Sequence, residues 1–161
     1  MDLLERLLAH DRWATNTLFD ACEPLTDEQF GRSFDIGHEN IHTTFAHIIG
    51  NVLYWTDSMK GIDIDRDQDW SRGNLRSLFE QVYGDFEQFA LAVRDAGRLD
   101  ETFTDSWDQP QSYGAAILHV ILHDDEHRQE ILHILNRLEI ENVPEIDHAL
   151  WDFVRRGLFT G

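Results

Sequence analysis

Four histidines fall within the nineteen residues ILHVILHDDEHRQEILHIL, residues 117–135. Three of them, His119, His123 and His127, recur at steps of four, so in a helix they lie near one another along one side. Neutral imidazole is a ligand for divalent ions such as zinc, and two histidines one helical turn apart can hold the same ion. The spacing therefore makes metal binding a candidate function of this segment.

The apolar pattern of the segment separates the four histidines. An inward-facing stripe at steps of three and four, typical of an amphipathic helix, passes through Ala116, Val120, His123, His127, Ile131, Ile134 and Leu138. The two histidines thus stand where a bundle normally has Leu or Ile, and burying an imidazole without a partner costs about 2 kcal/mol or more. They are either metal ligands or core histidines that hydrogen-bond to polar neighbours. His119 at the edge of the stripe and His133 off it are predicted to be edge or solvated residues, with His119 able to support a ligand.

A metal centre on this helix needs a third ligand from elsewhere in the chain. His10 in a first predicted helix and His42 or His47 in a second are the candidates. His10 falls on the apolar stripe of its helix. His47 lies off the centre of its own stripe, which passes through Ile41, Phe45, Ile48, Val52 and Trp55. Spacing alone does not choose among the three candidates.

Four helices and a short tail helix are predicted to position these residues. Apolar residues at helical spacing place them at residues 3–22, about 39–59, 75–93, about 111–138 and 146–156. The polar connection 60–73 is long for a bundle. It is long enough to cross the end of the bundle, in which case the second and third helices run parallel. Residues 98–114 are expected to be irregular or briefly extended. This pattern predicts an all-α four-helix bundle and a single domain over residues 1–161.

The charge and the composition limit the partners of this protein. With 31 acidic and 13 basic residues, the net charge is −18, which repels nucleic-acid phosphates and anionic membrane surfaces. No apolar stretch reaches the roughly 20 residues of a membrane span, and the N-terminal segment does not resemble a signal peptide. The single cysteine, Cys22, excludes an intrachain disulfide and a multi-cysteine zinc site. We therefore expect a cytoplasmic protein that binds a small molecule, without nucleic acid or membrane as a partner.

Other residues near the histidines are assigned to the surface or the core. Arg128 turns about 100° away from His127 and is predicted to be a solvated arginine. An exposed acidic face is predicted for Asp124, Asp125 and Glu126. Three tryptophans either wall a pocket or fill the core, namely Trp55, Trp107 and Trp151. The sequence identifies no catalytic residue.

Two histidine segments together resemble the DinB family, also described as DinB/YfiT-like metalloenzymes. The segment HTTFAHIIGNVLYW, residues 42–55, is similar to the second-helix signature of that family, whose histidine ligand corresponds to His47. The segment LHVILHDDEHRQEI, residues 118–131, is similar to the fourth-helix pattern, whose ligands correspond to His123 and His127. The segment DRWATNTLFDACEPLTDEQF also resembles the first helix and the loop after it. The resemblance implies a metal site at His47, His123 and His127.

The resemblance also implies a fold and a chemistry. The fold of the DinB family is a four-helix bundle in an up-down-down-up order, which agrees with the long connection at residues 60–73. Members of the family are frequently homodimers. The metal is divalent, most often zinc or nickel, and three neutral imidazoles would leave an open position where the pKa of a bound water or thiol falls. Well-understood relatives transfer low-molecular-weight thiols such as bacillithiol, mycothiol or glutathione, or use one as a cofactor for isomerisation. The chain departs from the family at Gln129-Glu130, where Gly-Gln is usual.

Three functions remain open at this point. The first is metal-dependent transfer of a low-molecular-weight thiol to a small electrophile. The second is metal-dependent hydrolysis of a small amide or ester, and the third is binding of a metal or small molecule without catalysis. Two Glu-x-x-His sequences, at residues 39–42 and 130–133, have the spacing of ferritin-like di-iron sites. That alternative is disfavoured because Glu130 and His133 lie off the inward stripe and Glu39 stands at the start of its helix.

Overall fold

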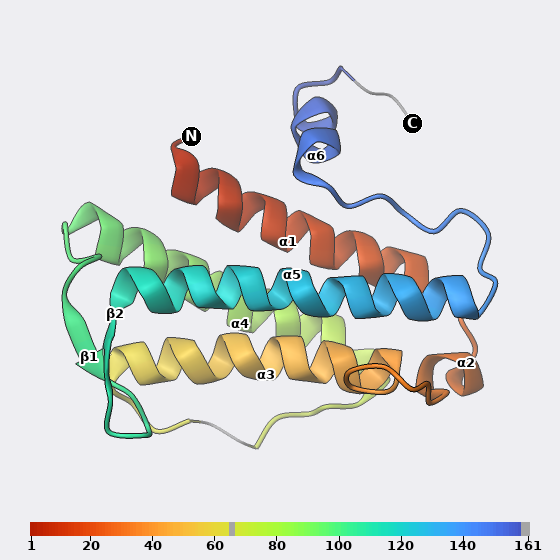
Figure 1. Ribbon diagram of the computed structural model, residues 1–161, viewed down its shortest axis with the longest axis horizontal. Helices are drawn as coiled ribbons and strands as arrows, with labels where there is room; N and C mark the ends of the chain where they lie inside the picture. The colour runs from red at the N-terminus through yellow and green to blue at the C-terminus, as the bar shows by residue number, and fades with distance from the viewer. Residues whose placement is uncertain (65–66, 159–161) are drawn as a thin grey trace. The chain divides into compact units, whose positions relative to one another are not determined.

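The computed structural model describes residues 1–64 and 67–158, which form six helices and two short strands (Figure 1). The elements are α1 (Leu3–Cys22), α2 (Asp27–Gly31), α3 (Ile41–Lys60), α4 (Arg72–Asp95), β1 (Thr102–Thr104), β2 (Pro110–Ser112), α5 (Tyr113–Arg137) and α6 (His148–Arg155). The predicted class, an all-α bundle with a short C-terminal helix, is confirmed. Residues 65–66 of the predicted connection and residues 159–161 of the predicted domain lie outside the described residues.

The chain divides into two compact units, Met1–Thr44 with Glu126–Gly161 and Phe45–Asp125. The first unit holds α1, α2, α6, the first residues of α3 and the second half of α5. The second unit holds the rest of α3, α4, the β1–β2 hairpin and the first half of α5. Both α3 and α5 continue from one unit into the other without a break. Each unit therefore contributes one half of the histidine helix.

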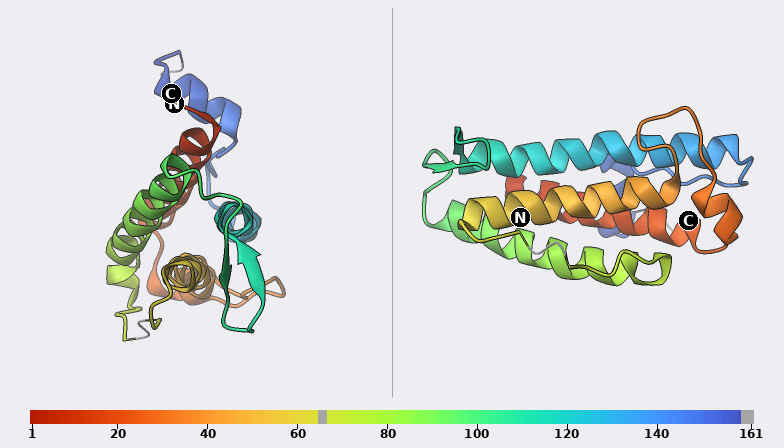
Figure 2. Two further views of the ribbon diagram at one scale, coloured as in Figure 1. Left: turned by 90° about the vertical axis from the view of Figure 1, so that its left-hand side faces the viewer. Right: turned by 90° about the horizontal axis from the view of Figure 1, so that it is seen from below.

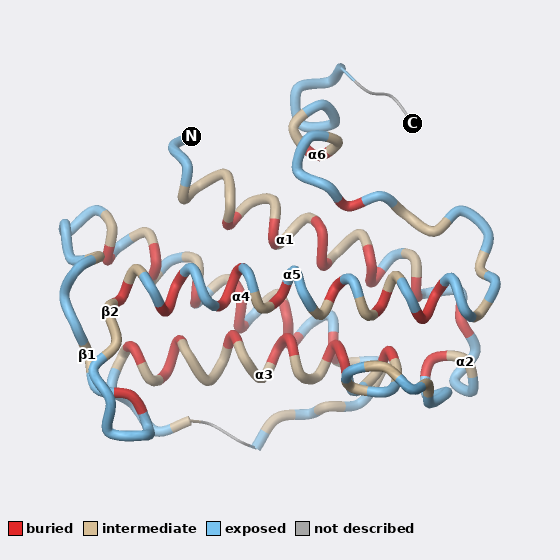
Figure 3. The backbone as a smooth tube through the Cα atoms, in the orientation of Figure 1, coloured by how far each residue is buried: buried red, intermediate tan, exposed pale blue. Residues whose placement is uncertain are grey.

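In the second unit, α3 and α4 run in the same direction and α5 runs in the opposite direction (Figures 1 and 2). The long connection after Lys60 makes this possible, as the sequence predicted. Buried residues recur on one face of α4 (Figure 3), and these are Leu75, Leu78, Phe79, Val82, Tyr83, Phe86, Ala90 and Val93. The helix ends where Gly97 takes a φ of +71°, a left-handed conformation that glycine adopts at little cost.

In the first unit, α1 begins with a capping box between Asp2 and Glu5, which satisfies two backbone N–H groups of the first turn. α1 contacts α6, whose Trp151 is 4% exposed. Near the start of α1, the guanidinium of Arg6 lies 3.3 Å from the carboxylate of Asp152 on α6. The tail helix of the sequence analysis is thus present and packs on α1.

Two short elements refine the predicted connections. The segment Asp27–Gly31 forms α2, begun by a capping box between Thr26 and Gln29, and the apolar pattern did not predict this helix. The briefly extended segment predicted before α5 is an antiparallel hairpin in which Phe103 pairs with Gln111. Within residues 1–64 and 67–158, no helix is long and apolar enough to cross a membrane.

Candidate metal centre

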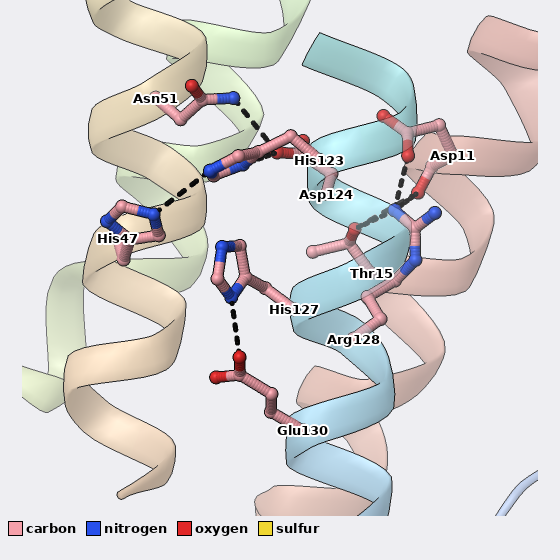
Figure 4. Close-up of polar contacts among 9 residues, drawn as sticks. All are labelled: Asp11, Thr15, His47, Asn51, His123, Asp124, His127, Arg128 and Glu130. Atoms are coloured by element: carbon pink, nitrogen blue, oxygen red, sulfur yellow. Dashed lines mark hydrogen bonds and ion pairs between the residues drawn. The ribbon is translucent and has the colours of Figure 1, made fainter. Parts of the chain in front are cut away.

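Two of the predicted ligands meet in the second unit. The Nε2 atoms of His47 on α3 and His123 on α5 lie 3.1 Å apart (Figure 4). The His123 side chain is 18% exposed, so the pair is accessible from solvent yet largely enclosed. Packing of α3 against α5 brings together residues that are 76 positions apart in the sequence. Periodicity had not favoured His47, but its ring reaches His123 from the side of its helix.

The distance between these two nitrogens fits a shared divalent ion. Two imidazole nitrogens bound to one zinc ion at about 2.0–2.1 Å lie about 3.3 Å apart at the tetrahedral angle and about 2.9 Å apart at a right angle. The observed 3.1 Å falls between these values. It also fits a hydrogen bond in which one ring donates N–H to the other, so the residues suit a metal without requiring one.

The third predicted ligand, His127, lies one turn after His123 on the same helix, in the first unit. Its side chain is 13% exposed, and its Nδ1 lies 3.1 Å from a carboxylate oxygen of Glu130 (Figure 4). A carboxylate at Nδ1 favours the tautomer that carries the proton there, which leaves Nε2 as the atom able to bind a metal. In the same unit, the rings of His38 and His127 lie 4.8 Å apart. His38, His47 and His127 each offer a ring nitrogen as a metal ligand.

The loop before α3 holds His38 and Glu130 together. The backbone N–H of His38 donates to Glu130 at 3.2 Å, and the hydroxyl of Thr43 donates to the carbonyl oxygen of His38. At Gly37, where φ is +31°, a Cβ atom would collide with the Glu130 carboxylate. The loop therefore approaches α5 closely because Gly37 has no side chain.

The other histidines of the sequence analysis lie in different settings. His10 forms a 2.8 Å hydrogen bond through Nε2 with the carbonyl oxygen of Ile146, and the ring of His42 lies 6.1 Å from that of Phe30. Neither contact suggests a role as third ligand. His119 and His133 are exposed, as predicted, and the ring of His119 lies 5.1 Å from that of Trp55.

Two predictions for α5 are wrong. Arg128, expected at the surface, is 1% exposed and ion-paired with the fully buried Asp11 of α1, and its guanidinium also donates to Thr15 at 3.2 Å (Figure 4). The predicted surface arginine is wrong because α1 covers this side of α5 in the first unit.

Asp124 is the second error. It was assigned to an exposed acidic face but is fully buried, and it accepts a 3.4 Å hydrogen bond from the amide of Asn51. Its oxygen lies 3.7 Å from Nδ1 of His123, beyond direct hydrogen-bond distance. Asp125 and Glu126 are exposed as predicted.

A pocket of about 770 Å³ opens beside the histidine pair, entirely within the second unit. Its walls are formed mainly by His47, Tyr54, Trp55, Trp70, Trp107 and His123. The remaining described lining residues are Ala46, Gly50, Asn51 and His119. A pocket of this volume with apolar walls and a few polar groups suits a small molecule.

Trp55 and Trp107 thus wall a pocket, whereas Trp151 is buried on α6. Trp70 was not singled out from the sequence because it lies in the connection before α4, where no period marks its direction. His38 and Glu130 were likewise missed as neighbours of His127. The contact of Glu130 with His127 could have been predicted, because residues three positions apart in a helix lie next to each other on its surface.

Comparison with known proteins supports the resemblance. No curated protein matches the sequence. A sequence profile of the DinB superfamily matches residues 10–131, a range that contains His47, His123 and His127 as well as both histidine segments. Because this range covers most of the 161 residues, the chain belongs to the DinB superfamily.

Proposed function

We propose that this protein binds a divalent metal ion, zinc or nickel, through His47, His123 and His127, and that it transfers a low-molecular-weight thiol to a small electrophile. The observation that carries the proposal is the 3.1 Å distance between Nε2 of His47 and Nε2 of His123, at the wall of a pocket of about 770 Å³. Membership of the DinB superfamily supports the same ligands.

His127 completes this set through its place on α5. Histidines at i and i+4 have Cβ atoms roughly 6 Å apart on one face, so His123 and His127 can share an ion. The carboxylate of Glu130, 3.1 Å from Nδ1 of His127, supports this role because it favours a ring with its Nε2 available to the ion. His38 is the alternative third or additional ligand, because its ring contacts that of His127.

The chemistry requires a thiol to lose its proton and attack carbon. A bound divalent ion with three neutral imidazole ligands lowers the pKa of a thiol, which makes its sulfur a better nucleophile near neutral pH. In the reaction with an alkyl or aryl halide, a sulfur–carbon bond forms, the carbon–halogen bond breaks, halide leaves with the bonding electron pair, and the thiol proton goes to solvent. The pocket walls orient the electrophile.

Metal content tests the ligand set directly. Tag-free protein should contain about one ion per chain by plasma mass spectrometry, and His47→Ala, His123→Ala and His127→Ala should each lose it. His133→Ala is the matched control, because His133 is exposed on the same helix. If the metal is lost from His38→Ala but retained in His123→Ala, then His38 and not His123 is the ligand. Absence of metal after reloading would contradict the proposal.

A second experiment separates thiol transfer from hydrolysis. Metal-loaded protein is supplied with bacillithiol, mycothiol or glutathione together with an epoxide or a halide, and adducts are identified by mass spectrometry. Ester or amide turnover without any thiol adduct would favour a metal-dependent hydrolase. Neither activity, with metal bound, would favour a binding protein.

A further inference from the structure

The pocket beside His47 and His123 is lined by aromatic rings drawn from three segments of the second unit. Tyr54 and Trp55 come from α3, Trp70 from the connection before α4, and Trp107 from the β1–β2 hairpin. The ring of Tyr54 lies 5.4 Å from that of Trp55 and 5.7 Å from that of Trp107. These separations are within the range in which aromatic rings attract one another.

The hairpin holds Trp107 by contacts of its own. The buried carboxylate of Asp105 accepts hydrogen bonds from the backbone N–H groups of Trp107, at 2.9 Å, and Gln109, at 3.0 Å. The hydroxyl groups of Tyr54 and Ser106 are hydrogen-bonded to each other. Trp107 nevertheless remains 66% exposed, so this ring has contact area to offer a ligand.

The lining selects against charged ligands. Among the described residues that form the pocket there is no Asp, Glu, Lys or Arg, and Asn51 supplies the side-chain amide. A cation would find aromatic faces but no carboxylate, and an anion would find no Lys or Arg side chain.

We propose that this pocket binds a neutral, planar aromatic group, and that this group belongs to the electrophile used in the proposed thiol transfer. Planar rings stack against indole and phenol faces and gain more than their buried area alone provides. The assignment of the ligand as a substrate rests on the proposed function. Recognition of the ring rests only on the pocket.

Gly50 provides a way to close the pocket without disturbing its frame. A Cβ atom at this position on α3 would lie 3.9 Å from the outer edge of the Trp70 ring, an ordinary contact distance, and a longer side chain would extend into the space beside Trp70. Gly84 on α4 is the matched control, since a Cβ atom there has no neighbour within 4 Å among the described residues. Replacing glycine within a helix favours the helix in both cases.

The experiment is calorimetric titration of the purified protein, with and without its metal, using three probes. These are 2-naphthol, its saturated and non-planar counterpart decahydro-2-naphthol, and the cation phenyltrimethylammonium. We expect 2-naphthol to bind about three- to tenfold more tightly than decahydro-2-naphthol, the ratio that ring stacking provides. Gly50→Leu, which fills the pocket, and Trp70→Leu, which removes a ring, should both lose this binding, while Gly84→Leu keeps it.

Equal affinity for the two naphthols, tighter binding of the cation, or unchanged binding in Gly50→Leu would overturn the proposal. Thermal melts of all variants establish that they are folded. Binding of 2-naphthol by a protein that takes up no metal would overturn the metal centre and leave the aromatic pocket. A metal-loaded protein without affinity for 2-naphthol would overturn the aromatic pocket alone.

Discussion

Glu130 stands where the DinB pattern has a glutamine, and its carboxylate lies 3.1 Å from Nδ1 of His127. Outer partners of this kind fix the ring of a metal ligand, and their loss typically lowers metal affinity about 10–100-fold. We expect that loss in Glu130→Ala. Glu130→Gln should lose less, because its amide oxygen can occupy the same place beside Nδ1. Competition with a chelator measures the affinities.

The control for Glu130 is Glu126→Ala, which changes an exposed glutamate of the same helix. Its metal affinity should equal that of the wild-type protein. If Glu130→Ala also binds metal like the wild type, His127 is either oriented by other contacts or is not a ligand.

The buried ion pair of Asp11 and Arg128 predicts a stability effect at two residues. Asp11→Ala removes the carboxylate beside a guanidinium that is 1% exposed, and breaking such a pair costs about 3–5 kcal/mol. The double variant Asp11→Leu/Arg128→Met should cost less than Asp11→Ala alone, because it removes both charges of the pair and leaves neither of them without its partner. Urea unfolding measures both, with the exposed Asp125→Ala as control. A loss below about 1 kcal/mol in Asp11→Ala would show that water reaches the guanidinium.

The setting of a residue was predictable from the sequence where a local pattern carried the information. One-turn spacing predicts His123 and His127 as ligands, and this stays a prediction, whereas the exposure of His133, predicted from the same pattern, is confirmed. Arg128 and Asp124 were misjudged because their partners, Asp11 and Asn51, lie 117 and 73 positions away. The sequence pattern shows only that a charged residue lies beside the apolar stripe of its helix. It does not show which other helix covers that residue.

At the scale of elements, the principal helices were predictable because each buries a continuous apolar stripe. The observed bounds Leu3–Cys22 and Tyr113–Arg137 lie within two residues of the prediction. The short helix Asp27–Gly31 has too few turns to show a period, although the capping pair Thr26 and Gln29 was a signal for it. The loop that brings His38 to Glu130 depends on contacts between α5 and a segment 92 positions away, which no local pattern reveals.

The contact between α1 and α6 predicts a pH dependence. Burial lowers the pKa of His10 below its ordinary value of 6.5, with Arg128 and His148 acting in the same direction, while the Ile146 carbonyl and Asp11 oppose them. The unfolded chain therefore binds a proton more readily than the folded one. The contribution of neutral His10 to the free energy of unfolding should be fully present above pH 6.5. It should be lost as the pH drops through 6.5 toward the lower pKa of the folded state.

His10→Gln tests this dependence, because glutamine keeps an N–H donor for the Ile146 carbonyl and does not titrate. Urea unfolding between about pH 7.5 and 5.5 should show a smaller loss of stability in the variant than in the wild type. His133→Gln, at an exposed position, should behave like the wild type. Identical pH slopes for His10→Gln and the wild type would assign the dependence to other groups.

At the scale of the molecule, the proposed ligands belong to different parts of the chain. His47 and His123 lie in the unit Phe45–Asp125, and His127 lies in the unit that contains Glu126–Gly161. An ion bound by all three would stabilise both units at once. The single domain over residues 1–161, the homodimer and the cytoplasmic location stay predictions. Hydrogen exchange with and without the metal tests the first of these, because it shows whether the two units are stabilised together.

Metal binding should therefore raise the stability of the whole chain. At a free ion concentration 100 times the dissociation constant, the gain is about 2.7 kcal/mol, or roughly 5–10 °C in Tm for a chain of this size. Hydrogen exchange should show added protection in both α1 and α4, which belong to different units, and His127→Ala should remove it from both. Protection confined to α4 would mean that His47 and His123 hold the ion without His127, and that the two units unfold independently.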